Sequence, residues 1–257
     1  MASRRLRRGV NGTILEGYVG TVEDLLAAVK AGDETAVDTL LTRNPELASA
    51  RDGDGGSALL TAIYYGRAGI VEKLLAAGAK PGLFEAAALG RLEDVSTALD
   101  SSPGAVDSWS RDGFTPLQMA AYFGQPEVVS LLLERGADIT PASRNPMKVT
   151  ALHAAAAHHR EGHAEAIVGL LIGRGADVNA IQEGGFTPLH AAAQNGYAGM
   201  ARRLLDAGAD ASATTAASKT ALNFAVEKDH SAVVVLLREH AGVGKQASGE
   251  RIPPVSS

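Results

Sequence analysis

The sequence predicts an all-α fold, a solenoid of about seven helix-turn-helix repeats with β-hairpin fingers between them. Two observations carry this prediction. A leucine is followed three residues later by a small residue and seven later usually by glycine, and a second apolar stretch follows each glycine. Self-similarity with a period of roughly 20–50 residues is typical of repeat architectures. The anchoring leucines are Leu25, Leu59, Leu83, Leu117, Leu152, Leu189 and Leu222.

The unit that begins at Thr115 shows why each repeat should form two helices. The threonine hydroxyl suits a helix N-cap, and Pro116 suits the first helical position because no N–H is needed there. Gly124 can end this helix by adopting a positive φ. The apolar stripe of residues 128–133 predicts a second helix, which Gly136 ends. Isolated helices shorter than about 12–15 residues are marginal in water, so each pair must pack on its neighbours.

At this point a family resemblance is visible. Thr115-Pro116-Leu117-Gln118-Met119-Ala120-Ala121 and Thr187-Pro188-Leu189-His190-Ala191-Ala192-Ala193 resemble the ankyrin signature T-P-L-H-x-A. Segments such as Gly136-Ala137-Asp138 resemble the family's helix-ending motif. The resemblance covers about residues 22–241. It implies a frame for binding other proteins, with groove positions in the fingers and in the two residues before each glycine.

The first three repeats depart from the family pattern. The first lacks the Thr-Pro start and has polar residues on its outer side, so it fits an N-terminal cap. Leu83 follows Leu59 by only 24 residues, which predicts that the finger before the third repeat is missing. Repeats one and three end in Asn44-Pro45 and Ser102-Pro103 turns. This alternation resembles bacterial-type ankyrin repeat proteins.

The later repeats differ as well. The fifth repeat is stretched by a histidine-rich insertion, interpreted as a solvated turn rather than a helix, with contact to a partner as the alternative. Asp229 replaces glycine in the seventh repeat, which fits the C-terminal cap. The domain organisation predicted is a basic, flexible arm over residues 1–21, a repeat domain over 22–241 and a flexible tail over 242–257. The arm contains Arg4, Arg5, Arg7 and Arg8 but no apolar stretch of the kind that a secretion signal needs.

Composition limits the classes of function. The net charge of −5 argues against a general nucleic-acid binder, and the chain has no cysteine for disulfides or thiolate chemistry. No stretch approaches the roughly 20 apolar residues of a membrane span. We therefore expect a cytoplasmic, monomeric protein without cofactor or metal.

Aromatic residues give the candidate binding site. Aromatics are only 4% of the chain, yet most of them fall at positions that the family geometry leaves facing the groove or in the fingers. Because aromatic side chains are enriched at binding hot spots, we predict a partner-binding strip centred on repeats two to four. Its residues are Tyr64, Tyr65, Trp109, Phe114, Tyr122, Phe123 and Phe186. An alternative is that about half of them pack only against neighbouring repeats.

The histidines between His153 and His163 are the one candidate for catalysis or metal binding. His159 and His163 have the i, i+4 spacing of a zinc pair on a helix, but Gly162 between them favours a turn. The resemblance assigns His153 and His190 to structural hydrogen bonds between repeats. Asp52, Asp112, Asp138 and Asp177 recur once per repeat, which indicates turn chemistry rather than an acid/base pair. No residue is therefore predicted to be catalytic.

The leading prediction is a non-catalytic protein–protein interaction module, whose partner the sequence does not name. One alternative is a nucleic-acid or anionic-surface binder that uses the arginine-rich arm. A remote alternative is a metal-dependent hydrolase at the His153–His163 cluster.

Overall fold

The computed structural model describes residues 20–247. The chain divides into two compact units, residues 1–85 and 86–257, which are described separately. The described residues form fourteen α-helices and three short 3-10 helices, and no strand is found among them. No helix in residues 20–247 combines the length and the apolar character needed to cross a bilayer.

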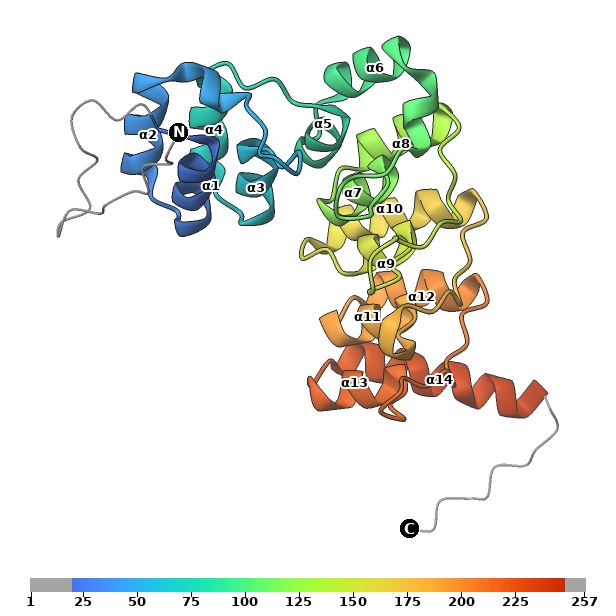
Figure 1. Cartoon of the computed structure of the whole chain (residues 1–257). Coiled ribbons are helices and arrows are strands. Elements are labelled where there is room, and N and C mark those ends of the chain that lie inside the picture. The colour runs from blue at the N-terminus through green and yellow to red at the C-terminus, as the bar shows by residue number, and fades with distance from the viewer. Residues whose placement is uncertain (1–19, 248–257) are drawn as a thin grey trace. The chain divides into compact units, whose positions relative to one another are not determined.

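The helices follow one another as seven pairs, which confirms the predicted all-α solenoid (Figure 1). The first unit contains α1 (Val22–Ala31), α2 (Glu34–Arg43), η1 (Pro45–Ala48), α3 (Ala58–Tyr64) and α4 (Ala68–Ala76). The boundary between the units falls inside α5 (Leu83–Leu89). The second unit continues with α6 (Leu92–Ser101), η2 (Pro103–Asp107), α7 (Pro116–Tyr122), α8 (Pro126–Glu134), α9 (Ala151–Ala156), α10 (Glu161–Gly173), η3 (Glu183–Gly185), α11 (Pro188–Asn195), α12 (Ala198–Asp206), α13 (Ala221–Glu227) and α14 (Ser231–Ala247).

Threonine caps begin α7, α9, α11 and α13, as predicted for Thr115, and Ser57 takes this place before α3. The Thr115 hydroxyl accepts a hydrogen bond from the Gln118 N–H, and the Gln118 side chain accepts one from the Thr115 N–H. Thr21, which precedes α1, makes the same reciprocal arrangement with Asp24. Each such box satisfies two backbone donors that the start of a helix leaves free.

Glycine ends these helices where a left-handed conformation is required. Gly32 and Gly196 are C-caps with φ of 72° and 77°, and Gly124 has a φ of 68°. In the seventh repeat Asp229 adopts the same conformation with a φ of 57°, which confirms that it takes the place of glycine.

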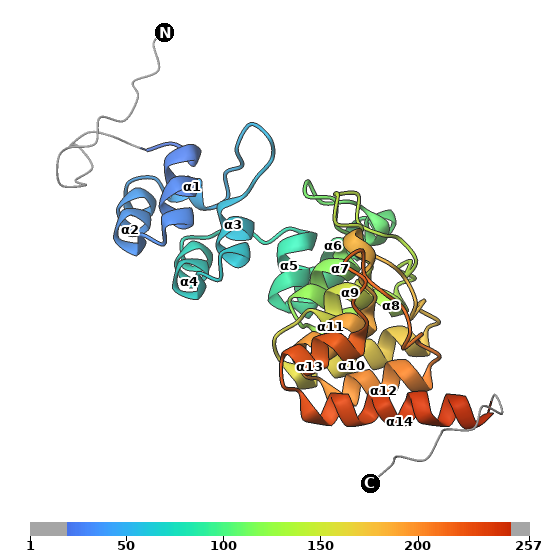
Figure 2. The same ribbon diagram turned by 90° about the horizontal axis from the view of Figure 1, so that it is seen from below.

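Leucine and alanine form the core of the second unit. The first helices α7, α9, α11 and α13 form one row and the second helices α8, α10, α12 and α14 another (Figures 1 and 2). Leu117, Leu152 and Leu189, each the second residue of its helix, are almost fully buried. Alanines such as Ala120 and Ala155, which have no exposed surface, let neighbouring first helices approach closely.

The fingers are hairpin turns closed by one backbone hydrogen bond each rather than two-stranded ladders. The N–H groups of Ser110, Ser143, Gln182 and Thr215 donate to the carbonyls of Phe114, Val149, Phe186 and Lys219. In the first unit the finger is the loop before α3, and an isolated antiparallel bridge joins Arg51 to Ser57 across it (Figure 2). The finger before the third repeat is missing, as predicted, because only residues 77–82 connect α4 to α5.

The turn interpretation of the recurring aspartates is supported by their contacts. The Asp52 carboxylate accepts hydrogen bonds from the N–H groups of Asp54 and Gly56 within the glycine-rich finger of repeat two. Asp138 and Asp177 accept from N–H groups two residues further along the chain. These carboxylates hold the chain's own turns.

The predicted limits of the repeat domain, residues 22 and 241, stay predictions, and the helical frame extends slightly beyond each of them. Thr21, assigned to the arm, is the N-cap of α1. Helix α14 continues to Ala247, beyond residue 241, where the repeat domain was predicted to end. The remainder of the predicted arm, residues 1–19 with their arginines, and of the predicted tail, residues 248–257, lies outside the described residues.

Candidate functional site

The fingers are joined to the preceding repeat by the side chain at the fourth position of the T-P-L-H motif. Gln118 accepts the Thr115 N–H through Oε1 and donates through Nε2 to the carbonyls of Pro141 and Val149. The same position in repeats five and six holds histidine. His153 Nε2 lies 3.1 Å from the Phe186 carbonyl, and His190 Nε2 lies 3.1 Å from the carbonyls of Ala213 and Lys219.

These two histidines are therefore used structurally, as the family resemblance implies. In each ring Nε2 faces carbonyl oxygens and must carry the proton, while Nδ1 faces a threonine hydroxyl. Burial lowers the pKa of both His153 and His190, and the hydrogen bonds to backbone carbonyls oppose that effect only in part. Neutral imidazoles with both nitrogens occupied are poor candidates for a metal ligand or a catalytic base.

A second set of side-chain contacts between neighbouring repeats lies at the turn between the two helices of a repeat. We call both sets of contacts joints. His158 Nδ1 lies 3.1 Å from the Tyr122 carbonyl, and His230 Nε2 lies 3.1 Å from that of Gln194. Each imidazole also packs over the helix-ending glycine of the preceding repeat, Gly124 or Gly196, where any Cβ would collide with the ring. In the first unit Arg67 takes this place against Gly32.

The predicted aromatic residues of the first unit lie at the end of α3. Tyr64 and Tyr65 are 37% and 52% exposed, which is unusual for large side chains in this chain. The other five predicted residues belong to the second unit, so the predicted strip consists of two sets, each in its own unit.

Tyr122 and Phe123 occupy the corresponding place at the end of α7. Tyr122 is 51% exposed, while Phe123 is half-buried. Their rings meet edge to face with centroids 5.1 Å apart. The pair therefore presents one ordered aromatic edge to solvent.

The three aromatic residues of the fingers are half-buried. The Arg144 guanidinium of the next finger lies 4.2 Å from the centre of the Trp109 ring, and Phe186 contacts the rings of His190 and Phe224. Phe114 closes its own finger through its backbone. Trp109 and Phe186 thus contribute to packing between repeats, the alternative that the sequence leaves open.

Sequence reasoning missed two exposed apolar residues in the fingers of the second unit. Met147 is 56% exposed in the finger of repeat five, and Ile181 is 66% exposed in that of repeat six. The Met147 carbonyl accepts the Glu183 N–H, which joins these two fingers. Neither residue is aromatic, so a search limited to aromatic residues could not find them; an apolar side chain inside a turn-rich finger is the signal that marks both.

The histidine-rich insertion is arranged differently from the solvated turn that was predicted. The extra residues lengthen α10, so His163 is helical, whereas His159 lies in the connection before it. His158 is only 6% exposed. The i, i+4 pair therefore does not share a helix, and the described residues contain no group of three or more metal-ligating side chains that could hold a metal ion.

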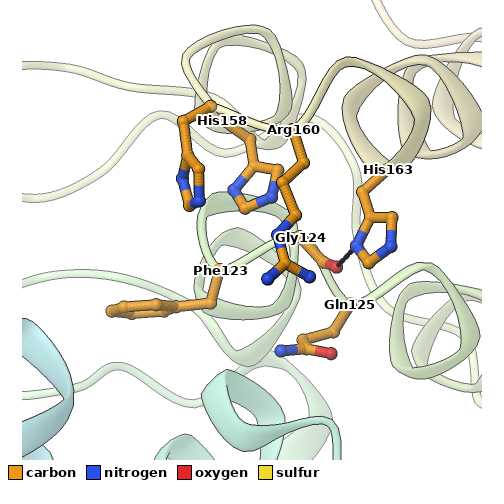
Figure 3. Close-up of a pocket in the computed structure, with 7 residues that line it drawn as sticks. Phe123, Gly124, Gln125, His158, Arg160 and His163 are labelled. Carbon is orange, nitrogen blue, oxygen red and sulfur yellow. Dashed lines mark hydrogen bonds between the residues drawn. The ribbon is translucent and has the colours of Figure 1, made fainter. Parts of the chain in front are cut away.

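The insertion instead borders an open cavity of about 260 Å³ between the α7–α8 turn and the start of α10. Figure 3 shows Arg160 and His163 on one side of it, facing Phe123, Gly124 and Gln125 on the other. His163 Nδ1 lies 2.8 Å from the Gly124 carbonyl, the contact drawn in the figure. The remaining lining residues are His158 and His159.

Comparison with known proteins agrees with this frame. A family model for ankyrin repeats in three copies matches residues 83–182 and 160–247. The chain is 29% identical to the E3 ubiquitin-protein ligase KEG of Arabidopsis thaliana over 80% of the chain, and 27% identical to the ankyrin repeat protein nuc-2 of Neurospora crassa over 90% of it. It is 35% identical to the B-cell lymphoma 3 protein homolog of Mus musculus over 61% of the chain. These matches cover 11%, 25% and 33% of the respective relatives, so the chain spans a third of their length or less.

Proposed function

Because the chain belongs to the ankyrin repeat family, whose repeats form protein–protein interaction modules, we propose that it is a non-catalytic module that holds one partner protein. The partner contacts the ends of the first helices and the fingers. The predicted contact residues are Tyr64, Tyr65, Trp109, Phe114, Tyr122, Phe123 and Phe186.

The observation that carries this proposal is the exposure of Tyr122 beside Phe123. The core of the chain is built from leucine and alanine, so packing does not require a tyrosine at the end of α7. Tyrosine supplies a large contact area at a low cost in conformational entropy and is among the residues most enriched at binding hot spots. Tyr64, which is 37% exposed, occupies the equivalent place in the first unit and supports the same interpretation.

The absence of catalysis in this proposal is supported by the use of the polar groups. His153 and His190 hold fingers, and the recurrent aspartates hold turns. The ligase activity in the name of the Arabidopsis relative belongs to that protein, and since the match covers 11% of it, that activity is not carried over.

The experiment begins with capture of the partner from a lysate of the native host, with identification by mass spectrometry. The double variant Trp109→Ala with Tyr122→Ala is then compared with the wild-type chain by calorimetry. Loss of two hot-spot aromatics should weaken binding by more than about 2 kcal/mol. Far-UV circular dichroism should stay unchanged, since loss of helicity would show that these residues are core.

A matched control removes exposed apolar surface elsewhere. Leu92→Ala with Val235→Ala truncates two residues that are 40% and 54% exposed but lie outside the predicted surface. This variant should bind like the wild type. Equal weakening in both double variants would contradict the proposed surface.

The arginine-rich arm remains a second candidate, because four arginines fall within residues 4–8. If the arm binds nucleic acid or another anionic surface, deleting residues 1–10 should remove a steep dependence of binding on salt concentration. A cytoplasmic location and a monomeric state remain predictions; the absence of cysteine supports the former.

A further inference from the structure

We propose that the cavity bordered by His158, Arg160 and His163 binds a side-chain carboxylate presented by an acidic segment of a protein partner. The inference rests on the proposed function only in that a partner carries the carboxylate. It adds the chemistry of one contact, in a cavity that shares only Phe123 with the predicted aromatic surface.

The lining of the cavity has one sign of charge. Its side chains are one arginine, three histidines, one glutamine and one phenylalanine, with no carboxylate among them. The open volume of about 260 Å³ is far above the roughly 10–15 Å³ that a single water needs, so a carboxylate and its water shell can enter. A concave site lined by cationic and donor groups attracts an anion.

His158 has one ring nitrogen that no polar group of the described residues occupies. Its Nδ1 must donate to the Tyr122 carbonyl, because a carbonyl oxygen only accepts. Its Nε2 is buried and has no hydrogen-bond partner, and it is the one such side-chain atom among the described residues. Buried polar atoms in folded proteins are nearly always partnered. In the neutral ring Nε2, which lies against Gly124, can only accept a hydrogen bond, so it becomes a donor when the ring takes up a proton. An anion in the cavity favours that protonated form.

The backbone adds positive potential at the same place. Gln125 and Arg160 are the N-cap residues of α8 and α10, and neither side chain caps its helix. The N-terminus of a helix carries a partial positive charge that favours anions. Two helix starts therefore reinforce the cationic lining.

The surroundings favour a carboxylate over a doubly charged group such as phosphate. Arg160 is the only permanent cation in the lining, and one charge matches a monoanion. Phe123 forms an apolar wall of the cavity and contacts the ring of Tyr122. The cavity is therefore continuous with an aromatic edge that already suits a protein partner.

Binding of the carboxylate should strengthen as the pH falls. The groups facing His158 are His159, Arg160 and His163, and its lowered pKa follows first from burial and then from these neighbours, against the Tyr122 hydrogen bond. The flanking elements also carry Glu127 on α8, Glu161 on α10 and Tyr197 before α12, none of which lines the cavity. A bound anion favours the protonated imidazole, so binding takes up protons and weakens as the pH rises.

The test uses the full chain and two peptides, acetylated and amidated tetraglutamate and its neutral tetraglutamine counterpart. Histidine ring signals are followed by NMR during titration at pH 6 and pH 8. Tetraglutamate should shift the His158 and His163 signals but not those of His190 and His240. If the bound peptide raises the pKa of His158 by about one unit, the full ten-fold tightening is reached only below the lowered pKa of the free ring, so binding should be tighter at pH 6 than at pH 8 by less than about ten-fold.

Variants separate the site from general charge. Arg160→Gln with His163→Gln should weaken tetraglutamate binding by about ten-fold or more, because it removes charge-assisted hydrogen bonds. Arg202→Gln with His240→Gln removes the same two residue types from exposed positions on α12 and α14 and should have no effect. Equal responses of both variants, a response to inorganic phosphate alone, or equal binding of the two peptides would overturn the proposal.

The outcomes also separate this inference from the proposed function. If tetraglutamate fails to bind while the Trp109 and Tyr122 variant still loses its partner, only the carboxylate site is wrong. If tetraglutamate binds at the cavity while that variant keeps its partner, the carboxylate site stands and the aromatic surface is wrong.

Discussion

The two units of the chain join their repeats with different side chains. In the first unit the finger before α3 is held by a carboxylate: Glu85, which is 3% exposed, accepts from the Ser57 hydroxyl at 2.7 Å and pairs with Arg51 at 3.2 Å. In the second unit the fingers are held by a neutral amide or imidazole, as at Gln118 and His190. The first unit therefore depends on charge where the second depends on uncharged donors.

The same contrast holds at the turns between paired helices. The flexible guanidinium of Arg67 lies against Gly32 in the first unit. In the second unit the flexible Gln125 lies against Gly90, but the rigid rings of His158 and His230 lie against Gly124 and Gly196. The second helices do not differ in this way. Exposed ion pairs such as Lys73–Asp38 and Arg135–Asp100 join them in both units. The same repeat backbone therefore accepts charged, flexible side chains as well as neutral, rigid ones between repeats. The stability of the two kinds of contact should differ in its dependence on side-chain shape, salt and pH.

The largest effect should come from adding a methyl group at a turn. Gly32 and Gly124 have nearly equal φ values of 72° and 68°, so alanine meets the same backbone strain at both. At Gly124 the new Cβ must also displace the imidazole of His158. Gly124→Ala should cost about 3 kcal/mol in the free energy of unfolding and Gly32→Ala about 1–2 kcal/mol, since Arg67 can move aside. Urea denaturation measures both, and equal losses would contradict the distinction between rigid and flexible joints.

Replacement of His190, which holds a finger, should separate the contribution of its hydrogen bonds from that of its ring packing. His190→Ala leaves the Thr187 N–H and two carbonyls without their partner and should cost about 2 kcal/mol. His190→Gln should cost under about 1 kcal/mol, because Gln118 already makes the equivalent three hydrogen bonds in repeat four. Thermal unfolding of the two variants measures the difference. Similar losses would mean that the ring itself, through its contact with Phe224, matters more than its hydrogen bonds.

The charged joint of the first unit should respond to salt. Glu85→Gln keeps an oxygen for the Ser57 hydroxyl but loses the ion pair with the half-exposed Arg51, so it should cost only about 1 kcal/mol. That loss should shrink at high salt, whereas the effect of His190→Gln should not change. Amide hydrogen exchange in α3 and α11 follows each unit separately. A loss at Glu85 that is independent of salt would show that the ion pair contributes nothing.

The smallest effect should appear in mild acid. Burial lowers the pKa of His153 and His190, so below about pH 6.5 the unfolded chain takes up protons that the native state does not. Stability of the second unit should therefore fall as the pH drops from that value towards the lowered pKa. The first unit contains no histidine and should not respond in this range. His153→Gln with His190→Gln should flatten the pH dependence in α9 and α11, which hydrogen exchange can measure.

Much of the helix-turn-helix architecture could be predicted because the same sequence pattern recurs in several repeats. The threonine caps, the glycine ends and the missing finger before α5 all follow from local chemistry that recurs at fixed spacing. The role of Glu85 could not be predicted in this way. It lies two residues after Leu83, where no other repeat has a carboxylate, and only the packing of an earlier finger makes it buried.

The candidate site was predictable only in part. Exposure of Tyr65 and Tyr122 follows from their position before a helix-ending glycine. The partial burial of Trp109 does not, because it depends on Arg144 in the next finger. His158 was misinterpreted because α9 is shorter than the other first helices of the second unit. The histidine therefore stands six residues after Leu152, whereas His230, which takes the equivalent place, stands eight after Leu222.

The joints of the second unit run in both directions along the chain. His190 reaches forward to the finger of the following repeat, while His230 reaches back to the helix end of the preceding one. A repeat is therefore expected to be gained or lost as a whole, since a cut inside one would leave backbone carbonyls of its neighbours without their donors. These two histidine positions therefore define where one repeat ends and the next begins. Repeats that carry the equivalents of His190 and His230 should be exchangeable at this boundary without any change to the rest of the chain.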